Sequence, residues 1–243
     1  MVLQTCKDGM DLLMEKRFSV PETILFMFTY PTIPIYIERG EVELAKQAIE
    51  ICYKNSKRKT NNWYVTHSYD VILGFYESRF EDVTMLLHKI KKYPTDIVRE
   101  RYVLYKAYLA LMGEERFRVR RFINDIPEFS KDKDGYNIAV IIIQLLHLLK
   151  GKYNDEYIDR IEATNQYIKR AINAKRVIRS KYFLKILLIL PSSNFHPVLF
   201  AAKAKSYLKK LKQLPISQSS PSVEIELIPY EVLYDRILEL LKK

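Results

Sequence analysis

The chain has 243 residues, of which 48% are hydrophobic and 28% charged, and its 40 basic and 29 acidic residues give a formal net charge of +11. This composition excludes an intrinsically disordered chain, and the length is enough for one large domain or two small ones with a sizeable core. Glycine is scarce at six residues and the ten prolines gather at a few points, which favours helices joined by short turns.

Apolar residues recur every three or four positions along most of the chain, as on one face of an α-helix. Val42, Ala45, Ile49 and Cys52 form one such stripe. The pattern predicts helices at 22–30, 35–54, 62–77, 80–92, 96–112, 115–126, 136–150, 154–174, 176–190, 195–213 and 230–242. Only 223–227 alternates like a strand, and it is short and stands between two prolines.

The predicted turns between helices resemble one another. Gly or Ser stands at positions 40, 78, 113 and 151, so the spacings are 38, 35 and 38. A small residue there lets the chain leave one helix and reverse, and the aromatic residue or Val that follows packs into the pair. A fixed period in the thirties indicates stacked helical hairpins.

These turns resemble those of a tetratricopeptide repeat, in which a Gly ends the first helix and an aromatic residue and an Ala follow. The best match is 40–45, from Gly40 to Ala45, and 151–153 keeps the Gly and an aromatic residue. The segment 78–80 has lost the Gly, 113–117 carries extra residues, and the early Trp and final Pro of each repeat are mostly absent. The resemblance covers roughly residues 35–175.

The resemblance implies an all-α, right-handed solenoid of antiparallel helix pairs, an α-α superhelix of about 10–11 helices, with a groove that binds a peptide or a partner helix. We expect a single helical-repeat domain over 1–243. Its parts are a repeat-like core at 35–175, a basic helix pair at 176–214 and a C-terminal segment at 223–243 that caps the stack, after a polar linker.

The positive charge is concentrated in one region. No Asp or Glu stands between Glu162 and Glu224, while that window contains twelve Lys and Arg, so the rest of the chain has a balance of −1. Such a window would attract nucleic-acid phosphate, an acidic protein surface or anionic lipid. Alternatively, these are solvated helix faces whose Lys and Arg stems cover apolar surface. The candidate anion-binding residues are Arg176, Arg179, Lys181, Lys203, Lys209 and Lys210.

The sequence carries no pattern that indicates catalysis, a metal or a cofactor. Glycine-rich phosphate loops, a nucleophile elbow and a His-Glu-x-x-His helix are all absent. The four histidines are scattered, and His147 within an apolar run is better explained as a structural residue than as a general base. We therefore expect no enzyme, no catalytic residue, no metal site and no cofactor.

The expected compartment is the cytoplasm. Two cysteines, Cys6 and Cys52, are too few for a disulfide framework or a four-ligand zinc site, so we expect free thiols. Residues 1–9 lack the order of a secretory signal. No apolar run reaches the roughly 20 residues of a membrane helix, and 139–149 and 186–190 are better explained as buried helix segments.

Two functional hypotheses remain open at this stage. The first is a non-catalytic protein–protein interaction module or scaffold that binds an acidic protein or peptide. Its groove residues, expected from helical phase and from the resemblance, are Asn62, Arg99, Lys106, Asn137 and Gln144. The second is a nucleic-acid-associated or regulatory protein that uses the basic region 163–223. Its 18 tyrosines could stack on bases, although Tyr at helical spacing is more often part of a core. A homo-oligomer also remains open.

Overall fold

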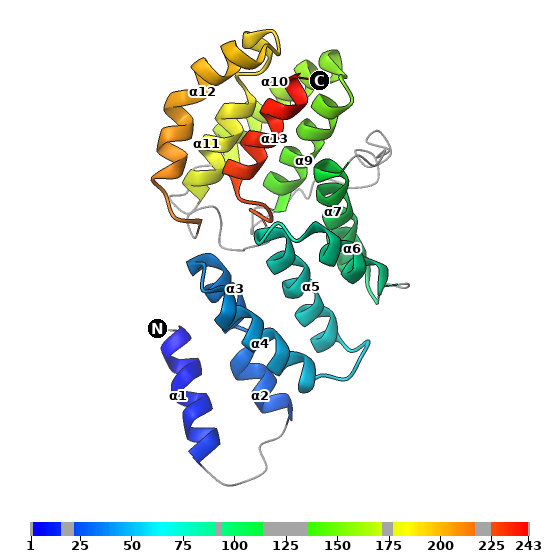
Figure 1. The fold of residues 1–243 in the computed structure, drawn as a ribbon, viewed down its shortest axis with the longest axis vertical. Coiled ribbons are helices and arrows are strands. Elements are labelled where there is room, and N and C mark those ends of the chain that lie inside the picture. Colours follow the sequence, from blue (N-terminus) through cyan, green and yellow to red (C-terminus); the bar gives the residue numbers. More distant parts are fainter. Residues whose placement is uncertain are drawn as a thin grey trace. The chain divides into compact units, whose positions relative to one another are not determined.

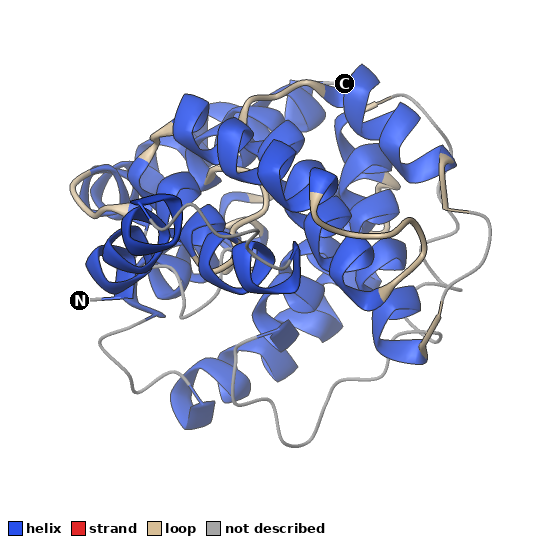
Figure 2. Ribbon diagram, turned by 90° about the horizontal axis from the view of Figure 1, so that it is seen from below, coloured by secondary structure: helices blue, strands red, loops and turns tan. Residues whose placement is uncertain are grey.

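The computed structural model describes residues 2–15, 22–90, 94–113, 136–171, 177–216 and 225–242. Every regular element in these ranges is a helix, as Figure 2 shows. The chain divides into two compact units, Met1–Arg99 and Glu100–Lys243, called unit 1 and unit 2 below. The division into two units does not test whether residues 1–243 form the expected single domain, which stays a prediction.

In unit 1, each helix from α1 to α5 packs on the next, up to α6 (Figure 1). The helices are α1 (Val2–Glu15), α2 (Glu22–Thr29), α3 (Thr32–Arg39), α4 (Val42–Lys54), α5 (Asn61–Tyr76), α6 (Phe80–His88) and the first residues of α7 (Asp96–Met112). Second neighbours also meet, as α1 does with α3 and α3 with α5. The core contains Ile33, Val71 and Phe75, whose side chains are fully buried.

Helices α3 and α4 are separated by a left-handed turn at Gly40. Gly40 has φ 69°, its N–H donates to Ile37 O at 3.0 Å, and the N–H of Glu41 donates to Tyr36 O at 2.9 Å. The two bonds satisfy carbonyls at the end of α3 and reverse the chain. The single helix expected over 35–54 is therefore wrong, because the turn at Gly40 divides it.

The same left-handed turn recurs elsewhere, but not always at the expected residue. It is found at Ser78, Lys152 and Asn194, with φ of 58°, 57° and 50°. In the turn after α9 (Tyr136–Lys150) the left-handed residue is Lys152 and not Gly151. Gly151 serves packing instead, since a Cβ there would overlap the ring of Tyr153. The turn expected after 113 lies outside the described residues, as does the helix expected at 115–126.

Unit 2 is organised around α9, in which every residue from 137 to 149 is buried. The other elements are α10 (Asn154–Ala171), α11 (Ile178–Leu187), the 3-10 turn η2 (Pro191–Ser193), α12 (Pro197–Lys212) and α13 (Tyr230–Lys242). Helices α10, α11 and α13 all pack on α9 (Figure 1). On another side, Tyr108 and the backbone of α7 hydrogen-bond to α9.

The all-α class and the mostly sequential packing are confirmed. The number of described helices is close to the ten or eleven expected. The packing of α13 on α9 joins helices far apart in the chain, whereas a repeat in a simple solenoid contacts only its neighbours. The right-handed superhelix therefore stays a prediction.

Five of the predicted helices agree with the structure to within one residue at each end. The bounds of α7, α9 and α13 are as expected, and those of α2 and α5 differ by one residue. Helix α6 ends at His88 and not at 92, and α11 ends at Leu187 and not at 190, where a turn and η2 follow. Helix α1 is absent from the predicted set. It contains Gly9, which weakens helix propensity but makes room for the ring of Phe28.

Within the described ranges, no helix has both the length and the apolar character needed to cross a bilayer. Helix α9, which is among the most apolar helices described, has 15 residues and packs against other helices of unit 2.

Candidate functional site

The five expected groove residues are not brought together. Asn62 is partly exposed on α5, and Arg99 and Lys106 are exposed on α7, two turns apart on one side of that helix. Asn137 and Gln144 are buried in α9, and Gln144 Oε1 accepts a hydrogen bond of 2.5 Å from Arg160 Nη2. Because other helices enclose α9, the buried positions of Asn137 and Gln144 do not fit a role in a surface groove.

Arg179, expected in an anion-binding patch, is in the interior of unit 2. Its side chain is 3% exposed and binds both carboxylate oxygens of Glu226, at 2.9 Å from Nε and 2.8 Å from Nη2. Nη2 also donates to Glu231, and Nη1 donates to the carbonyl oxygens of Leu211 and Leu214. Because the protein itself saturates the guanidinium, this side chain does not fit a role in binding an external anion.

The charge of Arg179 is stabilised by these acidic partners. Burial by itself lowers the pKa of Arg179, but the hydrogen bonds and charges of Glu226 and Glu231 outweigh it and raise that pKa. Both carboxylates stand outside the acid-free window in the sequence and reach it only through folding. The network attaches the segment before α13 to α11 and the end of α12.

Seven other basic residues of the window, all lysines, lie on the surface of α11 and α12, which pack side by side (Figure 1). We call them the lysine face: Lys181, Lys185, Lys203, Lys205, Lys209, Lys210 and Lys212. None of these seven makes an ion pair with another residue in the part of the chain that the structure describes. Arg176 lies outside the described residues. A group of unneutralised cations raises the local positive potential.

Two tyrosines lie within the lysine face. The rings of Tyr182 on α11 and Tyr207 on α12 have centroids 6.3 Å apart, with their planes tilted by 37°. Lys185 Nζ lies over the Tyr207 ring at 5.5 Å from its centroid, and Lys210 Nζ lies over the Tyr182 ring at 5.8 Å. Each helix thus supplies one Tyr and, one turn later, one Lys. We call these four residues the Tyr–Lys square.

Sequence reasoning did not single out Tyr182, Lys185 or Tyr207. The signal that could have found them is the pattern Tyr-x-x-Lys, which occurs at 182–185 and again at 207–210. That spacing places Tyr and Lys on one helix face. The pairing of α11 with α12 was needed to show that the two faces meet.

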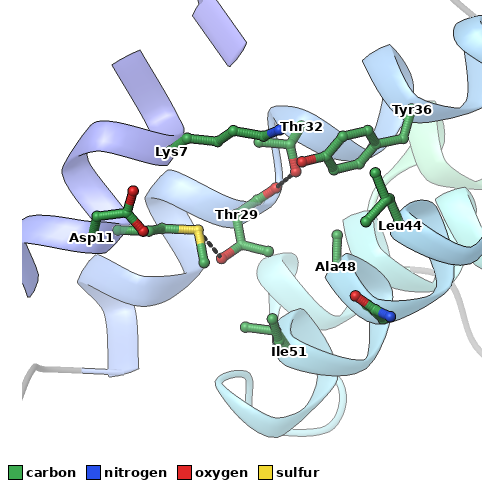
Figure 3. A pocket seen from close by; sticks show the side chains of 10 residues that line it. Lys7, Asp11, Thr29, Thr32, Tyr36, Leu44, Ala48 and Ile51 are labelled. Carbon is green, nitrogen blue, oxygen red and sulfur yellow. Dashed lines mark hydrogen bonds between the residues drawn. The ribbon is translucent and has the colours of Figure 1, made fainter. Parts of the chain in front are cut away.

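Unit 1 contains a small pocket of about 160 Å³ (Figure 3). It is lined by Lys7, Met10 and Asp11 of α1, Thr29 of α2, Thr32 and Tyr36 of α3, and Leu44, Gln47, Ala48 and Ile51 of α4. Thr29 Oγ1 donates to Leu25 O at 2.7 Å, and Thr32 Oγ1 donates to Thr29 O at 2.7 Å. Since both hydroxyls are engaged by the backbone, the floor of the pocket is mainly apolar.

The size of this pocket limits its occupant. Sites for cofactors and other small molecules usually have volumes of roughly 300–1,000 Å³. An apolar cavity of about 150 Å³ is large enough for benzene. The pocket therefore fits one apolar side chain better than a cofactor.

Burial favours the neutral form of three other titratable side chains, His147, His67 and Cys52. Burial lowers the pKa of His147 to about 4, and its Nε2 is 2.8 Å from Ala107 O. Burial lowers the pKa of His67 to about 4 and raises the pKa of the Cys52 thiol to about 12. Among the residues that the structure describes, no three His, Cys, Asp or Glu side chains are grouped as a metal site would require.

No family model, curated protein or solved structure matches this chain. The resemblance to tetratricopeptide repeats therefore stays a prediction, and function is argued from the geometry of the chain itself.

Proposed function

We propose that this protein acts by binding nucleic acid through the lysine face of α11 and α12. The observation that carries the proposal is the group of seven unneutralised lysines on one helix pair, two of which lie over the rings of Tyr207 and Tyr182. Unit 1 has 14 basic and 13 acidic residues and unit 2 has 26 and 16, so ten of the eleven surplus charges belong to unit 2. Lysine contacts to phosphates supply most of the sequence-independent affinity for nucleic acids.

An acidic protein is the main competing partner for this face. Protein interfaces usually have an apolar core with charge at the rim. Here Lys185 and Lys210 lie over a pair of tyrosines, and basic side chains beside aromatic rings are typical of surfaces that bind single strands. The exposed large apolar side chains of α12 are Val198 and Leu199, at its first turn and 69% and 50% exposed.

A salt titration with three polyanions tests the proposal. Binding of the full chain to a mixed-sequence 20-mer DNA strand, to its duplex and to poly-L-glutamate is followed by fluorescence anisotropy between about 50 and 200 mM salt. We expect binding to DNA with a steep, linear dependence of log K on log salt, because each phosphate contact releases counterions. Absence of DNA binding at the lowest salt, or tighter binding to poly-L-glutamate, would overturn it.

A pair of charge-matched variants distinguishes the effect of the lysine face on DNA binding from the effect of the net charge of the protein. The variant Lys203→Gln, Lys209→Gln, Lys210→Gln removes three charges from the face, and Lys57→Gln, Arg58→Gln, Lys59→Gln removes three exposed charges from unit 1. We expect only the first to weaken DNA binding and reduce the salt slope, by about 0.9 for each duplex phosphate that is no longer neutralised. Arg179 is left unchanged because it holds the fold together.

A second candidate function is a peptide-binding interaction module of tetratricopeptide-like type. The pocket in unit 1 favours it, because its volume suits one apolar side chain. Peptides selected on the protein by phage display should share an apolar anchor and lose affinity for the Ala48→Leu variant, whose larger side chain fills the pocket. Selected peptides that bind this variant as well as the wild type would exclude the pocket as their site.

We also propose that the protein is cytoplasmic and that it can associate with itself. Cys6 and Cys52 are both free and buried, which is compatible with a reducing compartment. Light scattering on the purified chain measures whether it forms a homo-oligomer.

A further inference from the structure

We infer that the Tyr–Lys square is a base-stacking site that makes the lysine face selective for single-stranded nucleic acid. The inference rests on the proposed function and adds a preference to it. Lysines alone do not distinguish a single strand from a duplex, because both present phosphates. The rings of Tyr182 and Tyr207 supply the preference for a single strand over a duplex.

The square places two partly exposed aromatic rings at the contact between two helices. Tyr182 and Tyr207 come from different helices, and their tilt of 37° turns their faces in different directions. Bases of a single strand can turn outward and stack on such rings, whatever their sequence, because every base has a π-face. Bases inside a duplex are already stacked on one another and do not present their faces.

The lysines of the square occupy the ring faces in the free protein. Lys185 Nζ and Lys210 Nζ lie 5.5 and 5.8 Å from the ring centroids. Lysine has a compact charge on a flexible four-carbon stem, so its ammonium can move to a phosphate without a change in the backbone. When it does so, the ring face is open to a base. Binding thus exchanges each cation–ring contact for one phosphate contact and one stacked base.

The rest of the lysine face lies beside the square. Lys203 is one turn before Tyr207 on α12 and therefore on the same side of that helix, where its Nζ donates to Ser192 O. Because Lys203 is exposed, its ammonium can exchange the Ser192 carbonyl for a phosphate beside a stacked base. The arrangement combines a backbone contact and a stacking contact in one place, as single-strand-binding proteins require.

The test compares three double variants at positions 182 and 207 of the full chain. Tyr182→Phe, Tyr207→Phe keeps both rings, Tyr182→Leu, Tyr207→Leu keeps apolar packing without an aromatic face, and Tyr182→Ala, Tyr207→Ala removes both. Affinity for the 20-mer strand and for its duplex is measured by anisotropy at fixed salt. We expect the wild type and the Phe variant to bind the strand alike. The Leu and Ala variants should bind it about tenfold more weakly for each ring removed, with duplex affinity unchanged.

Two results would overturn the inference while leaving the proposed function in place. One is a Leu variant that is folded by circular dichroism and binds the strand like the wild type. The other is an equal loss of strand and duplex affinity in that variant. Tyr30→Ala, which removes an exposed tyrosine of unit 1, is the matched control and should change neither affinity. A wild type that binds neither probe would instead overturn the proposed function itself.

Discussion

Arg179 joins segments that are distant in the chain. It connects α11, the end of α12 and the segment before α13 through Glu226, Glu231 and two backbone carbonyls. Removing one member of a buried ion pair leaves a charge without compensation, whereas removing both is much less costly. The intact network therefore stabilises unit 2, and loss of one partner destabilises it.

Replacement of Arg179 by Leu should destabilise the protein by about 3–5 kcal/mol, because Glu226 stays buried without its partner. Urea unfolding followed by circular dichroism measures the loss. The double variant Arg179→Leu, Glu226→Leu should recover part of it. Lys181→Gln, on the partly exposed side of α11, is the control and should stay within about 0.5 kcal/mol of the wild type. An unchanged urea midpoint for Arg179→Leu would contradict this role.

Stability should fall as the pH is lowered from about 6.5 to 4 because of His147. Its folded pKa of about 4 lies below the ordinary value of 6.5, so the unfolded chain binds more protons in this range. The neutral side chain contributes stability above pH 6.5, and roughly 3 kcal/mol of it is lost as the pH approaches 4. His67, with a similar pKa, should act in the same direction.

The variant His147→Gln isolates this contribution. Its amide can still donate to Ala107 O, but it does not titrate, so its unfolding free energy should decline less between pH 7 and pH 4. Urea midpoints at several pH values measure the difference. Identical pH profiles for the variant and the wild type would show that His147 does not carry the effect.

The exchange proposed for the Tyr–Lys square is favourable in magnitude. A cation–ring contact at an exposed site is worth about 0.5–1 kcal/mol. Stacking of one base on an aromatic side chain is worth about 1–3 kcal/mol, and the displaced Lys gains a phosphate in addition. Lys185 and Lys210 can therefore leave Tyr207 and Tyr182 without a net cost.

At the scale of the elements, the left-handed turn is the recurring device. Apolar periodicity located most helices, but the residue that ends each one follows from local backbone geometry. Gly40 adopts the left-handed conformation without strain, while Ser78, Lys152 and Asn194 adopt it with a Cβ.

Substitutions at two of these turns should have opposite effects on stability. Gly40→Ala forces a Cβ into the left-handed region and should destabilise by about 1 kcal/mol, whereas Ser78→Gly relieves strain and should stabilise by up to about 1 kcal/mol. Both positions are exposed, so packing changes little. Thermal unfolding measures the two shifts, and a shift of the same sign for both would contradict the strain argument.

At the scale of the whole molecule, the division into two compact units predicts separable stability. Leu233 of α13 is fully buried in unit 2, and Leu233→Ala should cost about 2–5 kcal/mol. Native-state hydrogen exchange should then show faster exchange in α9 and α13 and unchanged exchange in α4 and α5 of unit 1. Equal acceleration in both units would instead support the single domain expected from the sequence.

Local and periodic features of this protein could be derived from its sequence. The all-α class, the bounds of α7, α9 and α13 and the turn at Gly40 follow from helical spacing and from the conformational freedom of glycine, which act over a few neighbouring residues. The acid-free window was likewise visible, because charge is a property of composition. Helix α1 could not be predicted from the sequence, because its packing on α2 and α3 outweighs its weak local preference for a helix.

Contacts between distant segments could be established only with the fold in hand. Arg179 and Lys210 are both basic residues of the acid-free window. Arg179 is buried and paired with Glu226 and Glu231, whereas Lys210 is exposed. Gln144 has the spacing of a surface residue but belongs to a helix enclosed on several sides. Tyr182 and Tyr207 become neighbours because α11 packs on α12. Burial and pairing depend on which helices meet, and helical periodicity describes each helix only by itself.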